Sequence, residues 1–248
     1  MRFSLFALAL LVLAGCRTES TDPAPEADAP AETAEAVTTE APAPEAPDTE
    51  AAPAEATPGD LQPGVTAPAF TLTGTDGTDY TLADLRGKTV VLEWLNYDCP
   101  YVAKQYSTGN MTALQEGYTA GDDVVWLSIV SSAPGEQGHF EAEIMNERTE
   151  IEGGQQTAVL MDPTGEVGRL YGAKTTPHMY VISPEGTLVY NGAIDDHRVT
   201  SPDGLDQATT YFVNAMEALA AGQPADPART EPYGCSVKYA APQPAPDA

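Results

Sequence analysis

A change of composition near residue 60 most limits what this chain can fold into. Residues 17–60 consist mainly of Ala, Pro, Glu, Asp and Thr, with no aromatic residue and a single valine, Val37. Such a segment cannot bury enough apolar surface to offset the entropy lost on ordering. We therefore expect a disordered, extended acidic linker over residues 16–60 and a folded domain only after it.

Residues 61–239 are enough for one domain with its own core. Residues 240–248 return to Pro, Ala and Asp, so we expect a disordered tail there. Residues 61–248 hold twenty-five acidic and nine basic residues, and the whole chain carries a formal net charge of −26. A nucleic-acid partner is not expected, because phosphate binding requires a basic surface.

The amino end has the pattern of an export signal. Residues 3–15 form an almost unbroken apolar run. It is too short to span a bilayer, which needs about 20 residues, but suits a signal peptide over residues 1–15. The following Leu13-Ala14-Gly15-Cys16 resembles the lipobox of bacterial lipoproteins. The resemblance implies a lipid on Cys16 and a location at a membrane of the bacterial cell envelope, the outer membrane being preferred because Arg17 follows. An ordinary secretory peptide with a chance cysteine is the alternative.

Apolar spacing predicts an α/β domain, in which strands and helices alternate and a hairpin and a last helix follow. Strands are expected over residues 89–95, 124–130 and 157–161, and hairpins over 69–82 and 179–191. Helices are expected from residue 100, over 110–117 with Asn110 as a cap, over 139–151, from about 165 to 172 and over 205–221. Trp94 and Trp126 fall in apolar strands and are expected in the core.

One cysteine, Cys99, lies where a predicted strand ends and a predicted helix begins. A thiolate at a helix amino terminus faces free backbone N–H groups, which lower its pKa and make it a better nucleophile. Asp98 opposes this effect through its charge. Lys104 either folds back to assist the thiolate or, as we prefer, lies exposed on the helix. A buried, inert thiol is the alternative reading of Cys99.

Two segments carry a resemblance to a known family. Residues 90–100 resemble the active-site strand of thioredoxin-like redoxins, and residues 171–182 resemble the cis-proline loop of the same fold. With the Asp-Pro-Thr-Gly and Ser-Pro-Glu-Gly turns at residues 162–165 and 183–186, the likeness covers roughly residues 63–221. It indicates the redoxin family that includes alkyl hydroperoxide reductases and thiol-specific antioxidants, and it implies a thioredoxin-like fold with a central mixed β-sheet flanked by helices.

The resemblance also implies roles for particular residues. It implies a cis Thr176–Pro177 bond lying against Cys99, with Thr176, Pro177 and Pro100 as substrate-binding residues; a plain tight turn is the alternative. For His178, we prefer a strand histidine without a redox role. Residues 195–198, Asp-Asp-His-Arg, are interpreted as a solvated turn rather than a metal site.

The departures from the family are equally informative. Val102 replaces the second cysteine of a dithiol thioredoxin. A peroxiredoxin carries proline seven residues and threonine three residues before its reactive cysteine, where this chain has Leu92 and Asn96. Asn96 could still donate a hydrogen bond to a bound oxygen. Cys235 is interpreted either as the resolving partner of Cys99, as in some atypical peroxiredoxins, or, almost equally, as half of a permanent structural disulfide.

The sequence thus predicts a thiol-dependent oxidoreductase with antioxidant, peroxide-reducing activity. Cys99, Cys235 and Asn96 are the candidate catalytic residues, and Cys16 is the lipidation site. The expected partners are a peroxide or protein-disulfide substrate, an external thiol reductant and a membrane, with no metal or organic cofactor. The alternatives are a thiol–disulfide exchange protein and a non-catalytic envelope binding lipoprotein on a redoxin scaffold.

Overall fold

The computed structural model describes residues 59–241. The predicted signal peptide, residues 1–15, lies outside the described residues, as do almost all of the predicted linker, residues 16–60, and most of the predicted tail, residues 240–248. Within the described part of the chain, no helix is long and apolar enough to cross a membrane.

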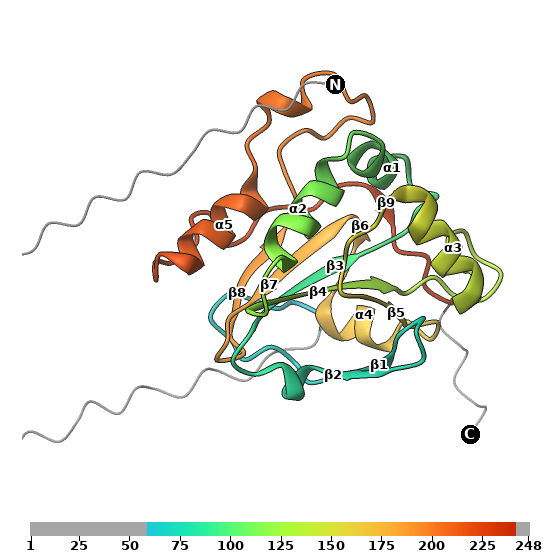
Figure 1. Ribbon diagram of the computed structural model, residues 1–248, viewed down its shortest axis with the longest axis horizontal. Coiled ribbons are helices and arrows are strands. Elements are labelled where there is room, and N and C mark those ends of the chain that lie inside the picture. The colour runs from blue at the N-terminus through green and yellow to red at the C-terminus, as the bar shows by residue number, and fades with distance from the viewer. Residues whose placement is uncertain (1–58, 242–248) are drawn as a thin grey trace, which may run out of the picture. The chain divides into compact units, whose positions relative to one another are not determined.

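A five-stranded mixed sheet of order β5-β4-β3-β7-β8 forms the centre of the domain (Figure 1). β3 pairs in parallel with β4, and β4 with β5, whereas β7 pairs antiparallel with both β3 and β8. The strands are β3 (Thr89–Trp94), β4 (Val124–Val130), β5 (Ala158–Met161), β7 (His178–Ile182) and β8 (Leu188–Gly192). The predicted α/β class with a central mixed sheet is confirmed.

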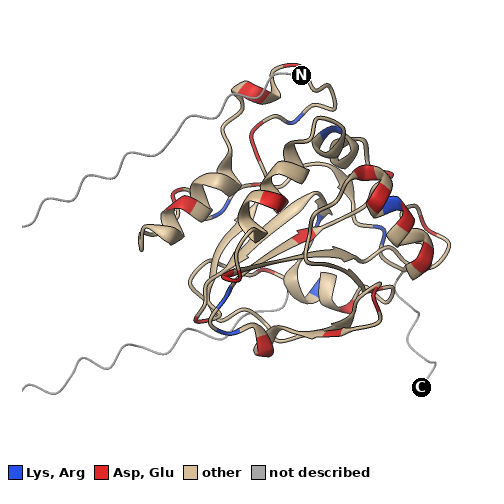
Figure 2. Ribbon diagram, in the orientation of Figure 1, with Lys and Arg blue, Asp and Glu red and all other residues tan. Residues whose placement is uncertain are grey.

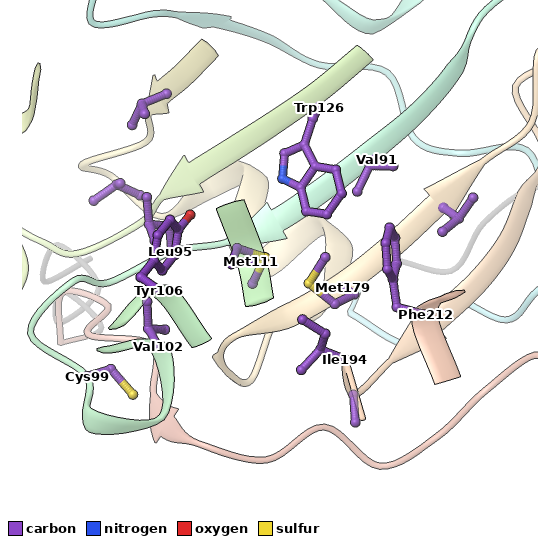
Figure 3. Packing of buried hydrophobic residues seen from close by; sticks show 14 of the residues in the cluster. Val91, Leu95, Cys99, Val102, Tyr106, Met111, Trp126, Met179, Ile194 and Phe212 are labelled. Atoms are coloured by element: carbon purple, nitrogen blue, oxygen red, sulfur yellow. The ribbon is translucent and has the colours of Figure 1, made fainter. Parts of the chain in front are cut away.

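Side chains of β3 alternate between two cores, because successive strand residues point to opposite faces of a sheet. Val91 belongs to the core shown in Figure 3, and Val90 and Leu92 belong to the core on the other face. The first core includes residues of α1 (Pro100–Ser107), α2 (Asn110–Thr119), α3 (Ala142–Glu152) and α5 (Tyr211–Ala220). The second core includes residues of α4 (Glu166–Tyr171), of the hairpin β1 (Thr71–Thr73)–β2 (Asp79–Thr81) and of the short helix η1 (Leu82–Leu85). Trp94 and Trp126 are buried, as predicted.

Two helix starts differ from the predictions. The N-cap of α2 is Gly109, whose φ of 74° suits glycine, and Asn110 is the first helical residue. α3 begins at Ala142 and not at residue 139, because the backbone N–H of His139 closes a turn on Glu136 and its ring lies 3.0 Å from the Ser132 carbonyl. Local contacts at both places override the apolar spacing.

The helix predicted over residues 205–221 is divided in two. A short helix, η2 (Leu205–Gln207), is followed by extended backbone at Ala208, and α5 begins at Tyr211. Thr209 causes the break, because its backbone N–H donates to the Asp196 carboxylate at 2.9 Å and its carbonyl accepts from the Asp196 N–H at 3.1 Å.

The chain after α5 forms a segment that we call the strap, residues 228–240. The strap first runs along β8, where the Asn191 N–H donates to the Ala228 carbonyl and the Thr230 N–H donates to the Asn191 carbonyl, both at 3.2 Å. It then forms β9 (Cys235–Ser236), which pairs antiparallel with β6 (Thr175–Thr176) (red and yellow in Figure 1). The sequence predicted no strand in this segment.

Acidic residues are spread over the helices and loops of the domain, and basic residues are few (Figure 2). Two of the arginines pair with aspartates: Arg148 lies 2.9 Å from Asp98, and Arg229 lies 2.8 Å from Asp60. Surface pairs of this kind add little stability. The Arg148–Asp98 pair lies next to the candidate site, because Asp98 directly precedes Cys99.

Candidate active site

Cys99 is the N-cap of α1, directly after the loop that leaves β3. Its backbone is extended, with φ −81° and ψ 122°, and Pro100 takes the favoured first helical position. Its carbonyl accepts the first helical hydrogen bond, from the Ala103 N–H at 2.8 Å. The side chain is 0 % exposed and lies at the edge of the first core, near Val102 (Figure 3).

The loop between α4 and β7 lies against this cysteine. The Thr176–Pro177 bond is cis, as the resemblance implied. The Cys99 thiol donates to the Thr176 carbonyl, with 3.1 Å between Sγ and the oxygen. Thr176 is itself buried.

The strap brings the second cysteine to the same loop. Cys235 pairs directly with Thr176 in the β6–β9 ladder, and the Val237 N–H donates to the Lys174 carbonyl at 3.0 Å. Both cysteines are free thiols; Cys99 is buried and Cys235 is partly exposed. The structure therefore gathers Cys99, Cys235 and Thr176 at one place, although Cys235 is far from the other two in the sequence.

The two thiols have opposite pKa shifts. Burial raises the pKa of Cys99, but hydrogen bonds from the side chains of Cys235 and Thr176 and from the backbone of Cys235 and Val102 outweigh it, so the net shift is downward. Burial, a hydrogen bond to Cys99 and the charge of its thiolate raise the pKa of Cys235 to about 11. Of the two thiols, Cys99 therefore loses its proton more readily, and Cys235 keeps its proton to higher pH.

Two predicted site residues make their contacts elsewhere. The Asn96 side chain accepts from the Asp98 N–H at 2.9 Å and donates to the Gln137 carbonyl at 3.4 Å, so its amide is engaged in shaping the loop. Pro100 is exposed and starts α1. One of the two amide N–H groups of Asn96, which was expected to donate to a bound oxygen, is thus engaged with Gln137.

Lys104 is neither exposed nor turned back toward Cys99, so both readings of it were wrong. It is buried, and its ammonium group donates to the carbonyls of His197 at 2.7 Å and Val199 at 3.1 Å and to the Tyr233 hydroxyl at 3.4 Å. Burial lowers the pKa of Lys104, and the charge of Asp195 partly restores it. No local pattern predicts this, because every partner is at least 93 residues away.

Sequence reasoning also missed a buried carboxyl group on β3. Glu93 is 0 % exposed, and its oxygens accept hydrogen bonds from Trp126, Ser128, Gln115 and Tyr106 at 2.9–3.3 Å. Burial raises its pKa, and these four donors partly offset the rise. The signal was present, since a single acidic residue interrupts an apolar run over residues 89–95.

The polar residues predicted to lie outside the site have structural contacts. His178 is buried on β7, where its Nδ1 lies 3.2 Å from the Tyr180 hydroxyl and accepts from the Lys174 N–H at 3.3 Å. The prediction of a solvated turn over residues 195–198 was wrong for Asp195, which is only 2 % exposed. Among residues 59–241, no group of three or more His, Cys, Asp or Glu side chains could hold a metal ion.

The domain has the features of a thioredoxin-fold thiol protein. These are a thioredoxin-like sheet, a cysteine at the start of α1 and a cis-proline loop that lies against the sulfur of that cysteine. The chain belongs to the Redoxin family, whose pattern matches residues 62–208. It is thus a thiol oxidoreductase of that family. The match ends before the strap, so Cys235 lies outside the part that defines the family.

Solved structures share the fold. An uncharacterized conserved protein from Geobacillus kaustophilus is 27% identical over 73% of this chain and 94% of its own, with a TM-score of 0.61. A hypothetical protein from Sinorhizobium meliloti is 22% identical over 76% of this chain and 100% of its own, with a TM-score of 0.58. None of the curated proteins compared with the chain matches it.

Proposed function

We propose that this chain is a thiol oxidoreductase with a pair of active cysteines, in which Cys99 is the nucleophile and Cys235 the resolving thiol. The observation that carries the proposal is the pairing of Cys235 with Thr176, the residue whose carbonyl accepts the Cys99 thiol. The opposite pKa shifts of the two thiols support the division of roles.

The substrate we favour is a disulfide. The Cys99 thiolate attacks one sulfur of the substrate, forms a mixed disulfide and releases one substrate thiolate. Cys235 then loses its proton and attacks the Cys99 sulfur, releasing the second thiolate and leaving a Cys99–Cys235 disulfide. The substrate gains two electrons, and the cysteine pair loses them. Two of the three main causes that raise the pKa of Cys235 come from Cys99 and disappear once Cys99 is in the mixed disulfide.

An external thiol returns the cysteine pair to the reduced state in two further exchange steps. Cys235 is the partly exposed member, so the incoming thiolate attacks its sulfur and forms a mixed disulfide there. Cys99 is the leaving group, and a thiol of lower pKa leaves faster. A second external thiol then releases Cys235. The exposure of Cys235 and the lowered pKa of Cys99 therefore both favour attack of the external thiol on the Cys235 sulfur.

Peroxide reduction is the second candidate, favoured by the complete burial of Cys99 behind the strap. A small oxidant requires less opening than a protein does. The Cys99 thiolate takes the terminal oxygen of the hydroperoxide and becomes a sulfenic acid, and the alcohol leaves. Cys235 condenses with the sulfenic acid and releases water. Against this candidate, the Asn96 side chain already donates to the Gln137 carbonyl and accepts from the Asp98 N–H.

The test uses the full-length protein, reduced and then exposed separately to oxidised glutathione and to hydrogen peroxide. Peptide mass spectrometry follows oxidation of each cysteine, and the matched variants are Cys99→Ser and Cys235→Ser. Fast formation of a Cys99–Cys235 disulfide with glutathione supports exchange, and faster formation with peroxide supports the second candidate. In Cys235→Ser, Cys99 should stop at a mixed disulfide or a sulfenic acid.

The contrary outcome is equally specific. If Cys99 oxidises no faster than a free cysteine with either reagent, the proposed chemistry is wrong. The remaining alternative is then a binding lipoprotein on a redoxin scaffold, for which Cys99→Ser leaves partner binding unchanged.

We also propose that the protein is held at a membrane of the cell envelope by a lipid on Cys16. The support is the apolar run over residues 3–15 and the following Leu13–Cys16 motif. Metabolic labelling with a radioactive fatty acid tests it. The wild-type protein should take up label and sediment with membranes, and Cys16→Ser should do neither. A labelled Cys16→Ser protein contradicts the assignment.

A further inference from the structure

Two tyrosines anchor the strap, one on each side of Cys235. Tyr233 lies two residues before the cysteine and Tyr239 four residues after it. The paired segment between them is short, because β6 and β9 contain two residues each. A two-stranded ladder is marginal in water even when it is longer. The position of Cys235 therefore depends on contacts outside the ladder.

The first anchor joins the strap to the helix that begins at Cys99. The Tyr233 hydroxyl donates to Oδ1 of Asp195, and the Lys104 ammonium donates to the same hydroxyl at 3.4 Å. Oδ2 of Asp195 accepts from the Gln105 side chain at 2.6 Å. Lys104 and Gln105 are both in α1, so Tyr233 is tied to the element that carries the nucleophile.

The Tyr233 ring is held as well as its hydroxyl. It packs edge-to-face on Tyr101 with 5.7 Å between ring centroids, and the Lys104 ammonium lies 5.2 Å from its centre. The ring stays in place when the hydroxyl is removed, because these contacts do not involve the oxygen. Tyr233→Phe therefore removes the hydrogen bonds of the hydroxyl with Asp195 and Lys104 and keeps the ring contacts.

The second anchor fixes the far end of the strap. The Tyr239 hydroxyl donates to the Ala173 carbonyl at 2.8 Å, and the Arg169 guanidinium lies 4.6 Å from the centre of its ring. The Ala133 N–H donates to the Lys238 carbonyl at 2.8 Å. This anchor holds the strap to the loop before β6 and to the loop after β4.

We propose that Tyr233 and Asp195 are positioning residues for the resolving thiol: their hydrogen bond holds Cys235 in register opposite Thr176 and keeps Cys99 covered. The inference rests on the proposed function for the meaning of the Cys99–Cys235 pair. The anchoring itself rests only on the contacts above. Neither residue touches the reacting sulfurs, so both act through the strap.

The consequence can be measured as an opening equilibrium. Cys99 is 0 % exposed and forms hydrogen bonds with Cys235 of the strap, so we expect a bulky alkylating reagent to reach it when the strap leaves. When opening and closing are fast, the modification rate follows the population of the open form. Loss of a buried hydrogen bond to a charged group should raise that population by about tenfold or more.

The experiment compares full-length Tyr233→Phe with the wild type and with Tyr80→Phe. Tyr80 is a matched control, because its hydroxyl also donates to an aspartate, Asp76, at 3.0 Å, but in the β1–β2 hairpin. Two quantities are measured: the alkylation rate of Cys99, by peptide mass spectrometry, and the equilibrium of the Cys99–Cys235 disulfide with glutathione. We expect Tyr233→Phe to raise the first about tenfold and to weaken the second, and Tyr80→Phe to change neither.

A fall in overall stability could also speed alkylation, so Asp195→Asn and the double variant complete a cycle. If the double variant changes the alkylation rate by less than the two single variants combined, both residues act through one hydrogen bond. Unchanged alkylation in Tyr233→Phe, or equal acceleration in Tyr80→Phe, overturns the inference. Accelerated alkylation in a protein that forms no Cys99–Cys235 disulfide keeps the anchoring and rejects the proposed function. If the Cys99–Cys235 disulfide forms but Tyr233→Phe does not affect it, the proposed function is kept and the anchoring is rejected.

Discussion

Thr176 and Cys235 face each other across the β6–β9 ladder, and the Thr176 carbonyl also accepts the Cys99 thiol. One residue of the cis-proline loop therefore contacts both halves of the cysteine pair. Val102 stands where a dithiol thioredoxin has its second cysteine. In the proposed function, the strap supplies that thiol from another part of the chain.

The first prediction concerns the pKa of Cys99. Cys235→Ala should raise it, because the side-chain donor that lowers it is lost, whereas Cys235→Ser should change it less, because a hydroxyl can still donate. Ultraviolet absorbance of the thiolate against pH measures both variants. Equal shifts in the two variants would show that exposure, and not the hydrogen bond, controls the pKa.

The second prediction concerns Gly234. A Cβ at this position, where φ is +135°, would lie 2.0 Å from the Thr176 carbonyl oxygen. Gly234→Ala should therefore displace β9 and speed the alkylation of Cys99. Gly77→Ala is the control, because φ is +80° there but no atom lies within 4 Å of the added carbon. Similar alkylation rates in the two variants would contradict the close approach.

The third prediction is a pH dependence of stability. Burial lowers the pKa of His178 to about 3, so the folded protein holds the ring neutral. The unfolded chain, with a pKa of about 6.5, binds a proton more readily between these two values, and stability falls as the pH drops through that window. The loss from His178 should be about 2 kcal/mol between about pH 7 and about pH 5.

His178→Asn isolates that contribution, because asparagine has no proton to gain in this range. Urea unfolding of both proteins at the two pH values gives the difference. The variant should lose less stability on acidification than the wild type. An identical loss in both proteins would mean that His178 does not titrate as the burial implies.

The fourth prediction concerns Glu93, whose pKa burial raises. A raised folded-state pKa gives stability that is present below the unfolded-state value and lost as the pH rises through the folded-state value. Glu93→Gln cannot ionise, so its stability relative to the wild type should improve as the pH increases. Denaturant unfolding from about pH 4.5 upward measures this. A constant difference over that range would indicate that folding does not raise the pKa of Glu93.

Much of the fold could be predicted because its signals are local. The apolar runs that form β3 and β4 are continuous, and the cysteine followed by proline marks the start of α1. The starts of α2 and α3 are shifted by local contacts, and two other errors arise where a distant group competes with local spacing. Thr209 leaves the helical pattern because Asp196 binds its N–H, and Lys104 is buried by a loop that follows it by more than 90 residues.

The candidate site divides in the same way. Cys99 is marked by its neighbours in the sequence, and the cis-proline loop by its resemblance to redoxins. The position of Cys235 has no local signal, because it depends on how the strap crosses the domain and on anchors such as Tyr233 and Asp195. Proximity of this kind comes from tertiary structure and not from the pattern around the residue.

The complete burial of Cys99 has a kinetic consequence. If the strap must leave before an oxidant reaches the sulfur, the observed rate cannot exceed the frequency of opening, whatever the oxidant concentration. Turnover would then saturate without a binding pocket for the oxidant. The half-saturating concentration would report the competition between reclosure and reaction, so a more reactive oxidant would saturate the protein earlier without binding it more tightly.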